Sequence, residues 1–244
     1  MQLFDNTILI TGGATGIGLA LAEQFVQLDN TVIICGRREQ KLIEARAKCP
    51  ELNIRVCDVT SLKERESLMH WVLDNFPKLN ILINNAGIQN NLELAHPIDI
   101  AAVQRETETN FIAPIHLSNL FTKHLKNQPD SAIINISSGL AFTPLAFMPV
   151  YCATKAALHS FSLSLRYQLS KTSISVFEIA PPTVDTELDG GARNQREQRD
   201  RGIKPEEFAQ LAIEAIQNDV YEAAIGFAAG LKLKREELFN KLNP

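Results

Sequence analysis

The sequence NTILITGGATGIG at residues 6–18 carries the strongest structural signal in the chain. Residues 6–10 are apolar and bounded by polar and glycine residues, which predicts a short buried strand. A helical pattern runs from residue 17 to residue 28, so the glycines form the turn between strand and helix. Glycines let the backbone approach a ligand closely, and a helix N-terminus offers unpaired N–H groups to a pyrophosphate. This order favours dinucleotide binding over a turn that is merely tight.

Strand and helix patterns continue to alternate along the chain. Apolar runs predict further strands at 31–35, 53–57, 80–83, 131–136, 174–179 and 224–226. Helical patterns lie at 39–48, 62–75, 100–126, 153–169, 205–218 and 232–242. The alternation predicts an α/β fold with a parallel sheet that is covered by helices on both faces.

Composition excludes several classes of protein. The 244 residues suit one α/β domain, and 45% hydrophobic with 21% charged residues is an ordinary soluble composition. A net charge of -4 argues against nucleic-acid binding. No apolar run reaches the roughly 18 residues that span a bilayer, and the N-terminus lacks a signal-peptide pattern. The four cysteines form no C-x-x-C pair, so we expect buried thiols in a reducing cytoplasm. The histidines lack H-x-x-x-H spacing, so we predict no metal site.

Two arginines follow the second predicted strand, in the sequence Gly36-Arg37-Arg38. In a βαβ nucleotide-binding fold this position faces the adenosine ribose. An acidic residue there binds the 2′-hydroxyl of NAD, whereas an arginine accommodates the 2′-phosphate of NADP. The alternative is a solvated loop charge. Because no acidic residue lies here, we expect NADP(H) to be favoured, with NAD(H) possible.

The candidate chemistry lies in a Tyr-x-x-x-Lys spacing, Tyr151 to Lys155. Side chains four residues apart share one face of a helix, so the phenol and the ammonium would lie together. A neighbouring positive charge favours the phenolate, which lowers a tyrosine pKa towards the range that suits acid–base catalysis. The spacing is common by chance, and a surface helix with an ordinary tyrosine and lysine is the alternative.

Polar residues elsewhere support the chemical interpretation. The predicted fourth strand ends in Asn84-Asn85-Ala86-Gly87, at the edge of the sheet where ligands bind in such folds. Ser138 follows the fifth strand. Asn110 lies shortly before Pro114, and a proline tends to kink a helix because it removes a backbone donor. We therefore expect Asn110 to meet disrupted backbone.

Together these motifs resemble the short-chain dehydrogenase/reductase family across essentially the whole chain. The matches are Thr11-Gly12-x-x-x-Gly16-x-Gly18, Asp58, Asn84-Asn85-Ala86-Gly87, Asn110, Ser138 and Tyr151-x-x-x-Lys155. Their order fits, including the 13 positions between Ser138 and Tyr151. The resemblance implies one Rossmann-type domain over residues 1–244, about seven parallel strands in a doubly wound sheet, and a nicotinamide cofactor.

The resemblance also assigns cofactor contacts. The glycine turn would hold the pyrophosphate, Arg37 the 2′-phosphate, and Lys155 the nicotinamide ribose. Contacts to adenine would come from the turn after the third strand, to the inner ribose from the turn after the fourth, and to the carboxamide from the turn after the sixth. The full set is Gly12, Thr15, Gly16, Ile17, Gly18, Arg37, Arg38, Asp58, Val59, Asn85, Ala86, Gly87, Tyr151, Lys155, Pro181, Val184 and Thr186.

The family's catalytic set would be Asn110, Ser138, Tyr151 and Lys155. Ser138 would donate a hydrogen bond to the substrate carbonyl oxygen, and Tyr151 would exchange a proton with that oxygen. Lys155 would lower the tyrosine pKa, and Asn110 would hold a water that links Lys155 to solvent. The implied reaction is hydride transfer between the cofactor and a small-molecule carbonyl or secondary alcohol.

Two positions depart from the family pattern. Pro182 stands where glycine is usual after the first proline of the sixth-strand turn, which should stiffen that turn. Thr15 stands where some NADP-preferring members carry a basic residue. The run Ala-Pro-Pro-Thr-Val-Asp-Thr at residues 180–186 resembles that of the DltE-like bacterial oxidoreductases.

Other properties stay open at this stage. A non-catalytic dinucleotide sensor that recruits a partner is the alternative function. The arginine-rich segment 187–204 is interpreted as a substrate lid. The loop after Gly87 and residues 140–150 would also shape the substrate site. In the latter, Phe142, Leu145, Phe147 and Met148 suggest a partly apolar pocket wall, and loop packing is the alternative. The family implies a homodimer or homotetramer through helices near 100–126 and 150–170, where Phe161, Leu165 and Leu169 could face a partner or the core.

Overall fold

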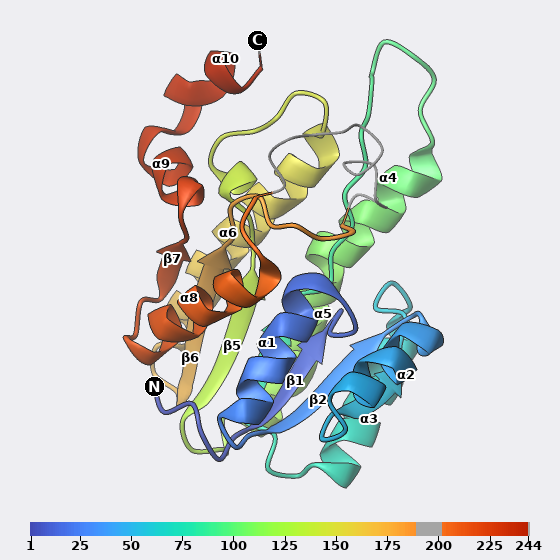
Figure 1. Cartoon of the computed structure of the whole chain (residues 1–244), viewed down its shortest axis with the longest axis vertical. Coiled ribbons are helices and arrows are strands. Elements are labelled where there is room, and N and C mark those ends of the chain that lie inside the picture. Colours follow the sequence, from blue (N-terminus) through green and yellow to red (C-terminus); the bar gives the residue numbers. More distant parts are fainter. Residues whose placement is uncertain (189–201, 244) are drawn as a thin grey trace.

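Seven short strands form one parallel sheet in the computed structural model, which describes residues 1–188 and 202–243 (Figure 1). Their order across the sheet is β3-β2-β1-β4-β5-β6-β7. The strands are β1 (Thr7–Thr11), β2 (Thr31–Gly36), β3 (Asn53–Val56), β4 (Ile81–Asn84), β5 (Ser131–Ile136), β6 (Ile174–Ala180) and β7 (Glu222–Ala224). This arrangement confirms the predicted doubly wound Rossmann-type sheet.

Helices cover both faces of the sheet. Successive residues of a strand point to opposite faces, so Ile8 and Ile10 pack in one core and Leu9 in the other. The first face carries α1 (Gly16–Gln27), α2 (Glu39–Lys48) and α8 (Pro205–Gln217). The opposite face carries α3 (Leu62–Asn75), α5 (Ala113–Leu125) and α6 (Pro149–Leu169). Within the described ranges, no helix is both long and apolar enough to cross a membrane.

The helix predicted at 100–126 is interrupted by a π-helical turn. It consists of α4 (Ile100–Thr107), the π turn η1 (Glu108–Ile112) and α5. A π turn holds one residue more than an α turn and is frequent at functional sites. Asn110 lies in the middle of η1. The backbone disruption expected near Asn110 is therefore present as a π turn, and Pro114 lies just beyond it in the first turn of α5.

Two other helix boundaries differ from the sequence prediction. Helix α6 begins at Pro149 instead of residue 153, since a proline in the first turn suits a helix start. The terminal helix predicted at 232–242 is broken into α9 (Phe227–Lys234), the 3₁₀ turn η3 (Arg235–Leu238) and α10 (Phe239–Leu242). Arg235, at the break, has a φ of 47°, which an α-helix does not allow.

The sequence did not decide whether three apolar side chains of α6 pack in the core or face a partner, and in the structure they pack in the core. Leu165 and Leu169 are buried against α5 and the sheet, and Phe161 packs against the same cluster. All four cysteines are free thiols, and Cys35, Cys57 and Cys152 are buried. Most of the predicted lid, residues 189–201, lies outside the described residues. A β-bridge joins Val184, just before the predicted lid, to Ile203 near its end.

Candidate active site

A cavity of about 860 Å³ opens at the carboxyl edge of the sheet, where the strand order reverses between β1 and β4. It is lined by Ser138, Tyr151, Lys155 and every residue predicted to contact a cofactor. Asn110 is fully buried and lies behind this wall. Residues from seven separate segments of the chain are therefore brought to one place, and their chemical roles stay predictions.

The glycine turn is packed tightly against the turn that follows β4. Gly12 has a φ of 64°, and a Cβ there would lie 2.8 Å from the Cα of Ala86. A Cβ on Gly18 would lie 2.4 Å from the carbonyl oxygen of Gly12. Asn85 Nδ2 donates to the carbonyl oxygens of Thr11 at 2.9 Å and Gly12 at 3.1 Å. Glycine is required at these positions because no side chain fits between the two turns.

The start of α1 fits a bound pyrophosphate. Thr15 is its N-cap residue, but no side chain caps the N–H groups of the first turn. Backbone donors at a helix N-terminus that lack a capping side chain are a ready site for an anion. A dinucleotide therefore fits this end of the cavity.

Arg37 and Arg38 line the cavity next to this helix start. Arg38 Nη2 donates to Thr15 Oγ1 at 3.2 Å, so its guanidinium reaches back over the glycine turn. Some family members that prefer NADP carry a basic residue at the position of Thr15. In this chain the guanidinium of Arg38, from the turn after β2, lies against Thr15 instead. The arrangement supplies positive charge beside the place where a ribose phosphate would lie.

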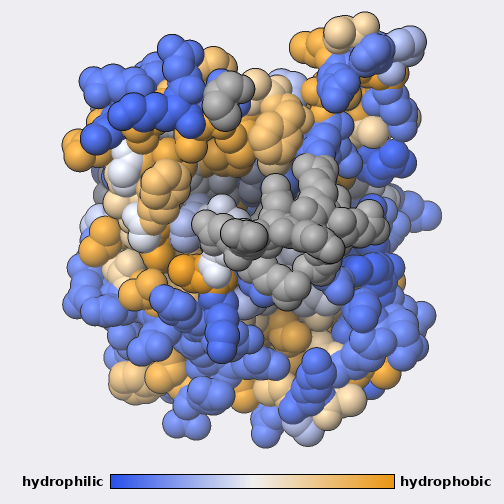
Figure 2. All heavy atoms as spheres, turned by 45° about the horizontal axis from the view of Figure 1, so that its top comes forward, coloured by the Kyte–Doolittle hydropathy of each residue, from blue (hydrophilic) through white to orange (hydrophobic). Residues whose placement is uncertain are grey.

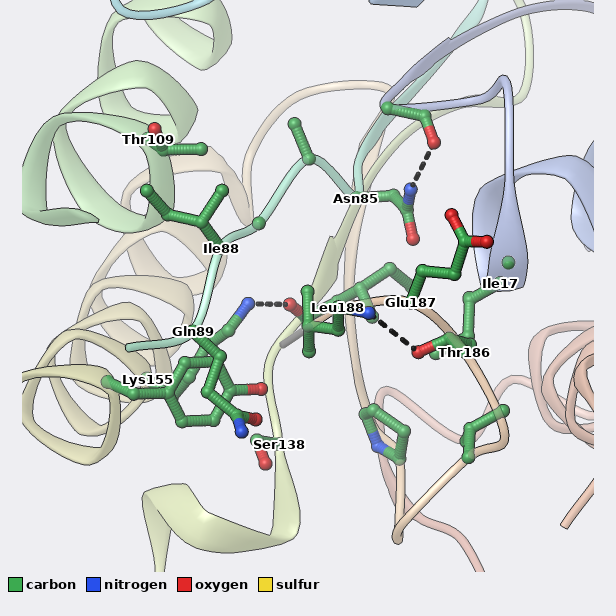
Figure 3. Close-up of a pocket in the computed structure, with 18 of the residues that line it drawn as sticks. Ile17, Asn85, Ile88, Gln89, Thr109, Ser138, Lys155, Thr186, Glu187 and Leu188 are labelled. Atoms are coloured by element: carbon green, nitrogen blue, oxygen red, sulfur yellow. Dashed lines mark hydrogen bonds between the residues drawn. The ribbon is translucent and has the colours of Figure 1, made fainter. Parts of the chain in front are cut away.

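Lys155 is buried at the centre of the site (Figure 3). Its Nζ donates to the carbonyl oxygen of Ile136 at 2.9 Å and lies 5.8 Å from the centroid of the Tyr151 ring. Burial lowers the pKa of Lys155 to about 8, although the carboxylates of Glu178 and Glu106 act in the opposite direction. The predicted closeness of Tyr151 and Lys155 is therefore present, and the ammonium is less firmly protonated than an exposed lysine.

Ser138 is oriented as a hydrogen-bond donor. Its Oγ accepts from the N–H of Leu140 at 3.1 Å, where a 3₁₀ turn η2 (Gly139–Ala141) begins. Because that bond uses a lone pair of the oxygen, the hydroxyl proton stays available to an oxygen in the cavity. Next to it, Ser137 Oγ is buried and has no hydrogen-bond partner among the described residues.

Asn110 fastens the loop after β4 to the helix that carries it. Its amide donates to the carbonyl oxygen of Ile88 and accepts from the N–H of Ile88, both at 2.9 Å, and also donates to Thr154 Oγ1 at 3.1 Å. A Cβ on Gly87 would lie 3.5 Å from Asn110 Oδ1 and 3.7 Å from Lys155 Nζ. Gly87 thus leaves a small space between these two polar groups. The water link proposed for Asn110 stays a prediction.

The sequence predicted only part of the wall opposite the cofactor residues. Apolar side chains form much of this wall, and Figure 2 shows hydrophobic residues gathered at this edge of the molecule. Of the four apolar residues that the sequence left between a pocket wall and loop packing, Phe142 is buried in the core, whereas Leu145, Phe147 and Met148 line the cavity. Lining residues that the sequence did not single out include Gln89, Asn90 and Asn91 of the loop after Gly87, and Arg105, Phe227, Leu231 and Leu242. The last three come from helices far along the chain, and only their helical spacing hinted at a shared face.

A histidine and two carboxylates also come together, against the expectation from histidine spacing. They are His159, Glu178 and Glu222. His159 Nδ1 lies 2.7 Å from Glu178 Oε2, and this hydrogen bond is the main reason that the pKa of His159 is raised. Glu222 pairs with Lys232 at 2.9 Å. Both carboxylates therefore have a basic partner within the chain.

Comparisons with known proteins agree with this geometry. The sequence profile of the family described as short chain dehydrogenase matches residues 6–197. The uncharacterized oxidoreductase DltE of Bacillus subtilis is 46% identical over 248 residues, covering 100% of this chain and 98% of DltE. The NADP-dependent 3-hydroxy acid dehydrogenase YdfG of Escherichia coli is 31% identical, covering 88% of this chain and 86% of YdfG. A solved closed form of serine dehydrogenase complexed with NADP+ has a TM-score of 0.82 at 27% identity, covering 90% of this chain and 94% of that chain.

The profile covers most of the chain, and the similarity to DltE extends over its full length. The fold and the arrangement of the cavity are those that the sequence motifs implied. The chain therefore belongs to the short-chain dehydrogenase/reductase family and, within it, to the DltE-like oxidoreductases.

Proposed function

We propose that the protein is an NADP(H)-dependent reductase of carbonyl compounds, or dehydrogenase of the matching secondary alcohols, with Tyr151 as general acid and base. The observation that carries the proposal is the convergence of Tyr151, Lys155 and Ser138 on one wall of a cavity whose other end fits a dinucleotide. A bound nicotinamide cofactor would supply the hydride. The chain must then bind the substrate, orient its carbonyl group and manage a proton.

Ser138 and Tyr151 handle the reacting oxygen. In reduction, negative charge grows on that oxygen, and the Ser138 hydroxyl stabilises it because its own oxygen already accepts from Leu140. Tyr151 donates the proton. The buried ammonium of Lys155 favours the phenolate that remains. In alcohol oxidation, each proton moves in the reverse direction.

The preference for NADP(H) is part of the proposal. Arg37 and Arg38 both line the cavity beside the helix start, and no carboxylate takes the place of the acidic residue that would bind an NAD ribose. YdfG and the serine dehydrogenase, whose names or structures include NADP, have similar sequences or folds. NAD(H) remains the competing cofactor.

Replacing Tyr151 by phenylalanine tests the mechanism. We expect Tyr151→Phe to lower NADPH consumption with a panel of ketones, aldehydes and sugars by at least about 100-fold, since general acid–base catalysis contributes that much. NADPH affinity, measured by cofactor fluorescence, should change little. Tyr167→Phe is the matched control, because Tyr167 is 84% exposed on the same helix.

Undiminished turnover in Tyr151→Phe would refute the proposed mechanism. A wild-type protein that binds NADPH tightly but reduces no member of the panel would instead support the alternative, a dinucleotide sensor that recruits a partner.

We also expect a homodimer or homotetramer through the helices near 100–126 and 150–170. Leu163 and Ile112 are 43% and 38% exposed within these ranges, and Leu163 lies one helical turn before the exposed Tyr167. Light scattering after chromatography measures the state, and Leu163→Glu should shift it towards the monomer.

A further inference from the structure

Gln89 is a buried polar side chain that the proposed mechanism does not use. Only 9% of its surface is exposed, and it lines the cavity. In Figure 3 its side chain points towards Ser138. Across the part of the chain that the structure describes, its amide has no hydrogen-bond partner, although a glutamine amide offers two donors and an acceptor.

The backbone on both sides of Gln89 is held by one helix. Asn110 binds both backbone polar groups of Ile88 at 2.9 Å. One turn earlier, the buried Glu106 accepts from the N–H of Asn90 at 3.3 Å and from its Nδ2 at 3.0 Å. Gln89 therefore sits between two fixed points. The backbone that carries this side chain is therefore held in place before a ligand binds, which removes part of the ordering cost of binding.

The cost of an unused amide favours a polar ligand. A buried polar group that a ligand leaves unpaired destabilises the complex, whereas a ligand that pairs with it gains a hydrogen bond. Apolar side chains, with Leu145, Phe147 and Phe227 among them, form part of the remaining wall, and Asn90, Asn91 and Arg105 line it as well. Gln89 differs from these in being a buried neutral amide that points towards Ser138.

We infer that Gln89 binds a second, uncharged oxygen substituent of the substrate, on a carbon next to the reacting carbonyl. The inference rests on the proposed reductase function. It assigns the substrates to α-hydroxyketones, vicinal diketones and the matching diols, with an apolar remainder. Ser138 and Tyr151 would take the reacting oxygen, and the amide of Gln89 would donate to its neighbour or, for a hydroxyl group, accept from it.

Matched pairs of substrates test the assignment. The pairs are diacetyl with butanone and benzil with deoxybenzoin, which differ only in the second carbonyl. Diketones are intrinsically more easily reduced, so the ratio of kcat/KM within a pair does not isolate Gln89. The contribution of Gln89 is isolated by comparing this ratio between the wild-type protein and Gln89→Leu, because the intrinsic reactivity of the substrates is the same in both. We expect the ratio to fall about tenfold, which corresponds to the loss of one hydrogen bond of about 1.4 kcal/mol.

The control is Gln104→Leu, the same replacement at an exposed position of α4 that does not line the cavity. It should keep the wild-type ratio. An unchanged ratio in Gln89→Leu, with turnover of both members of a pair, would overturn the inference and leave the proposed function standing.

A wild-type protein that reduces none of these ketones would speak against the proposed function but would not test the role of Gln89. A binding measurement tests that role without turnover. Hydrobenzoin, a diol, and the mono-alcohol made from deoxybenzoin cannot react when NADPH is bound. Calorimetric titration of both into the NADPH complex gives a ratio of affinities. Gln89→Leu should lower the preference for the diol about tenfold, and equal affinities in the wild-type protein would overturn the inference.

Discussion

Asn110 binds the backbone of Ile88 with both ends of its side-chain amide, donating to the carbonyl oxygen and accepting from the N–H, each at 2.9 Å. This pairing ties a π-helical turn to the loop that forms one wall of the cavity. It explains how a buried asparagine that does not itself line the cavity can control the site. Its loss should affect stability and turnover together.

Asn110→Ala should lower the free energy of unfolding by about 1–3 kcal/mol, because it leaves the carbonyl and N–H of Ile88 without partners. Urea denaturation measures this change. Asn127→Ala is the control, since Asn127 makes a single exposed bond, to the carbonyl oxygen of Lys123 at 3.1 Å. Equal stability of the two variants would contradict the proposed role of Asn110 in holding the loop.

The buried ammonium of Lys155 should make stability depend on pH. Its pKa is about 8 in the folded protein, against 10.5 for an ordinary lysine side chain such as that of the unfolded chain. Between these values the unfolded chain binds more protons, so the free energy of unfolding rises with pH. At about 1.4 kcal/mol per pKa unit, the full rise is about 3 kcal/mol.

Urea denaturation of the cofactor-free protein from neutral pH to above pH 10 checks this rise. Lys155→Met should abolish it, and Lys63→Met, at an exposed position of α3, should retain it. A wild-type curve that is flat over this window, or a rise that survives in Lys155→Met, would argue against a buried, destabilised charge.

Arg38→Ala should weaken NADPH binding more than NADH binding. A charge-assisted hydrogen bond to a phosphate is worth about 1.5–3 kcal/mol, which corresponds to a loss of roughly 10- to 100-fold for NADPH alone. Fluorescence titration with both cofactors gives the two affinities. Arg46→Ala, at an exposed position in the last turn of α2, should leave both affinities unchanged. A parallel loss for NADH would mean that Arg38 does not read the 2′-phosphate.

Gly18 and Gly230 should respond to alanine in opposite directions. A Cβ at Gly18 would lie 2.4 Å from a backbone oxygen, so Gly18→Ala should cost about 1–3 kcal/mol and impair cofactor binding. Gly230 lies inside α9, and a Cβ there meets nothing within 4 Å. Gly230→Ala should therefore stabilise the protein by about 0.5–1 kcal/mol. Thermal unfolding distinguishes the two outcomes, and stabilisation by Gly18→Ala would show that the two turns are not tightly packed.

Local patterns in the sequence predicted the sheet and one end of the cavity well. Continuous apolar runs such as Ile81–Asn84 and the glycine turn after β1 are set by residues close together in the chain. Sequence patterns predicted less of the cavity where segments that are far apart in the chain come together. Gln89 lies in a loop without periodicity, and Phe227 reaches the cavity only because the chain returns to it after β7. The π turn was also not predicted, since Pro114 indicated a kink but not an added residue.

The π turn has a consequence for changes in gene length. An α turn has about 3.6 residues and a π turn has one more, so η1 takes up an extra residue without changing the relative orientation of α4 and α5. Deletion of one codon between Glu108 and Ile112 would therefore restore a continuous α-helix and leave Glu106 beside Asn90. Only the turn that carries Asn110, and with it the bonds to Ile88, would change. A one-residue deletion in this helix could thus reshape the loop that carries Gln89 while the rest of the helix stays in register.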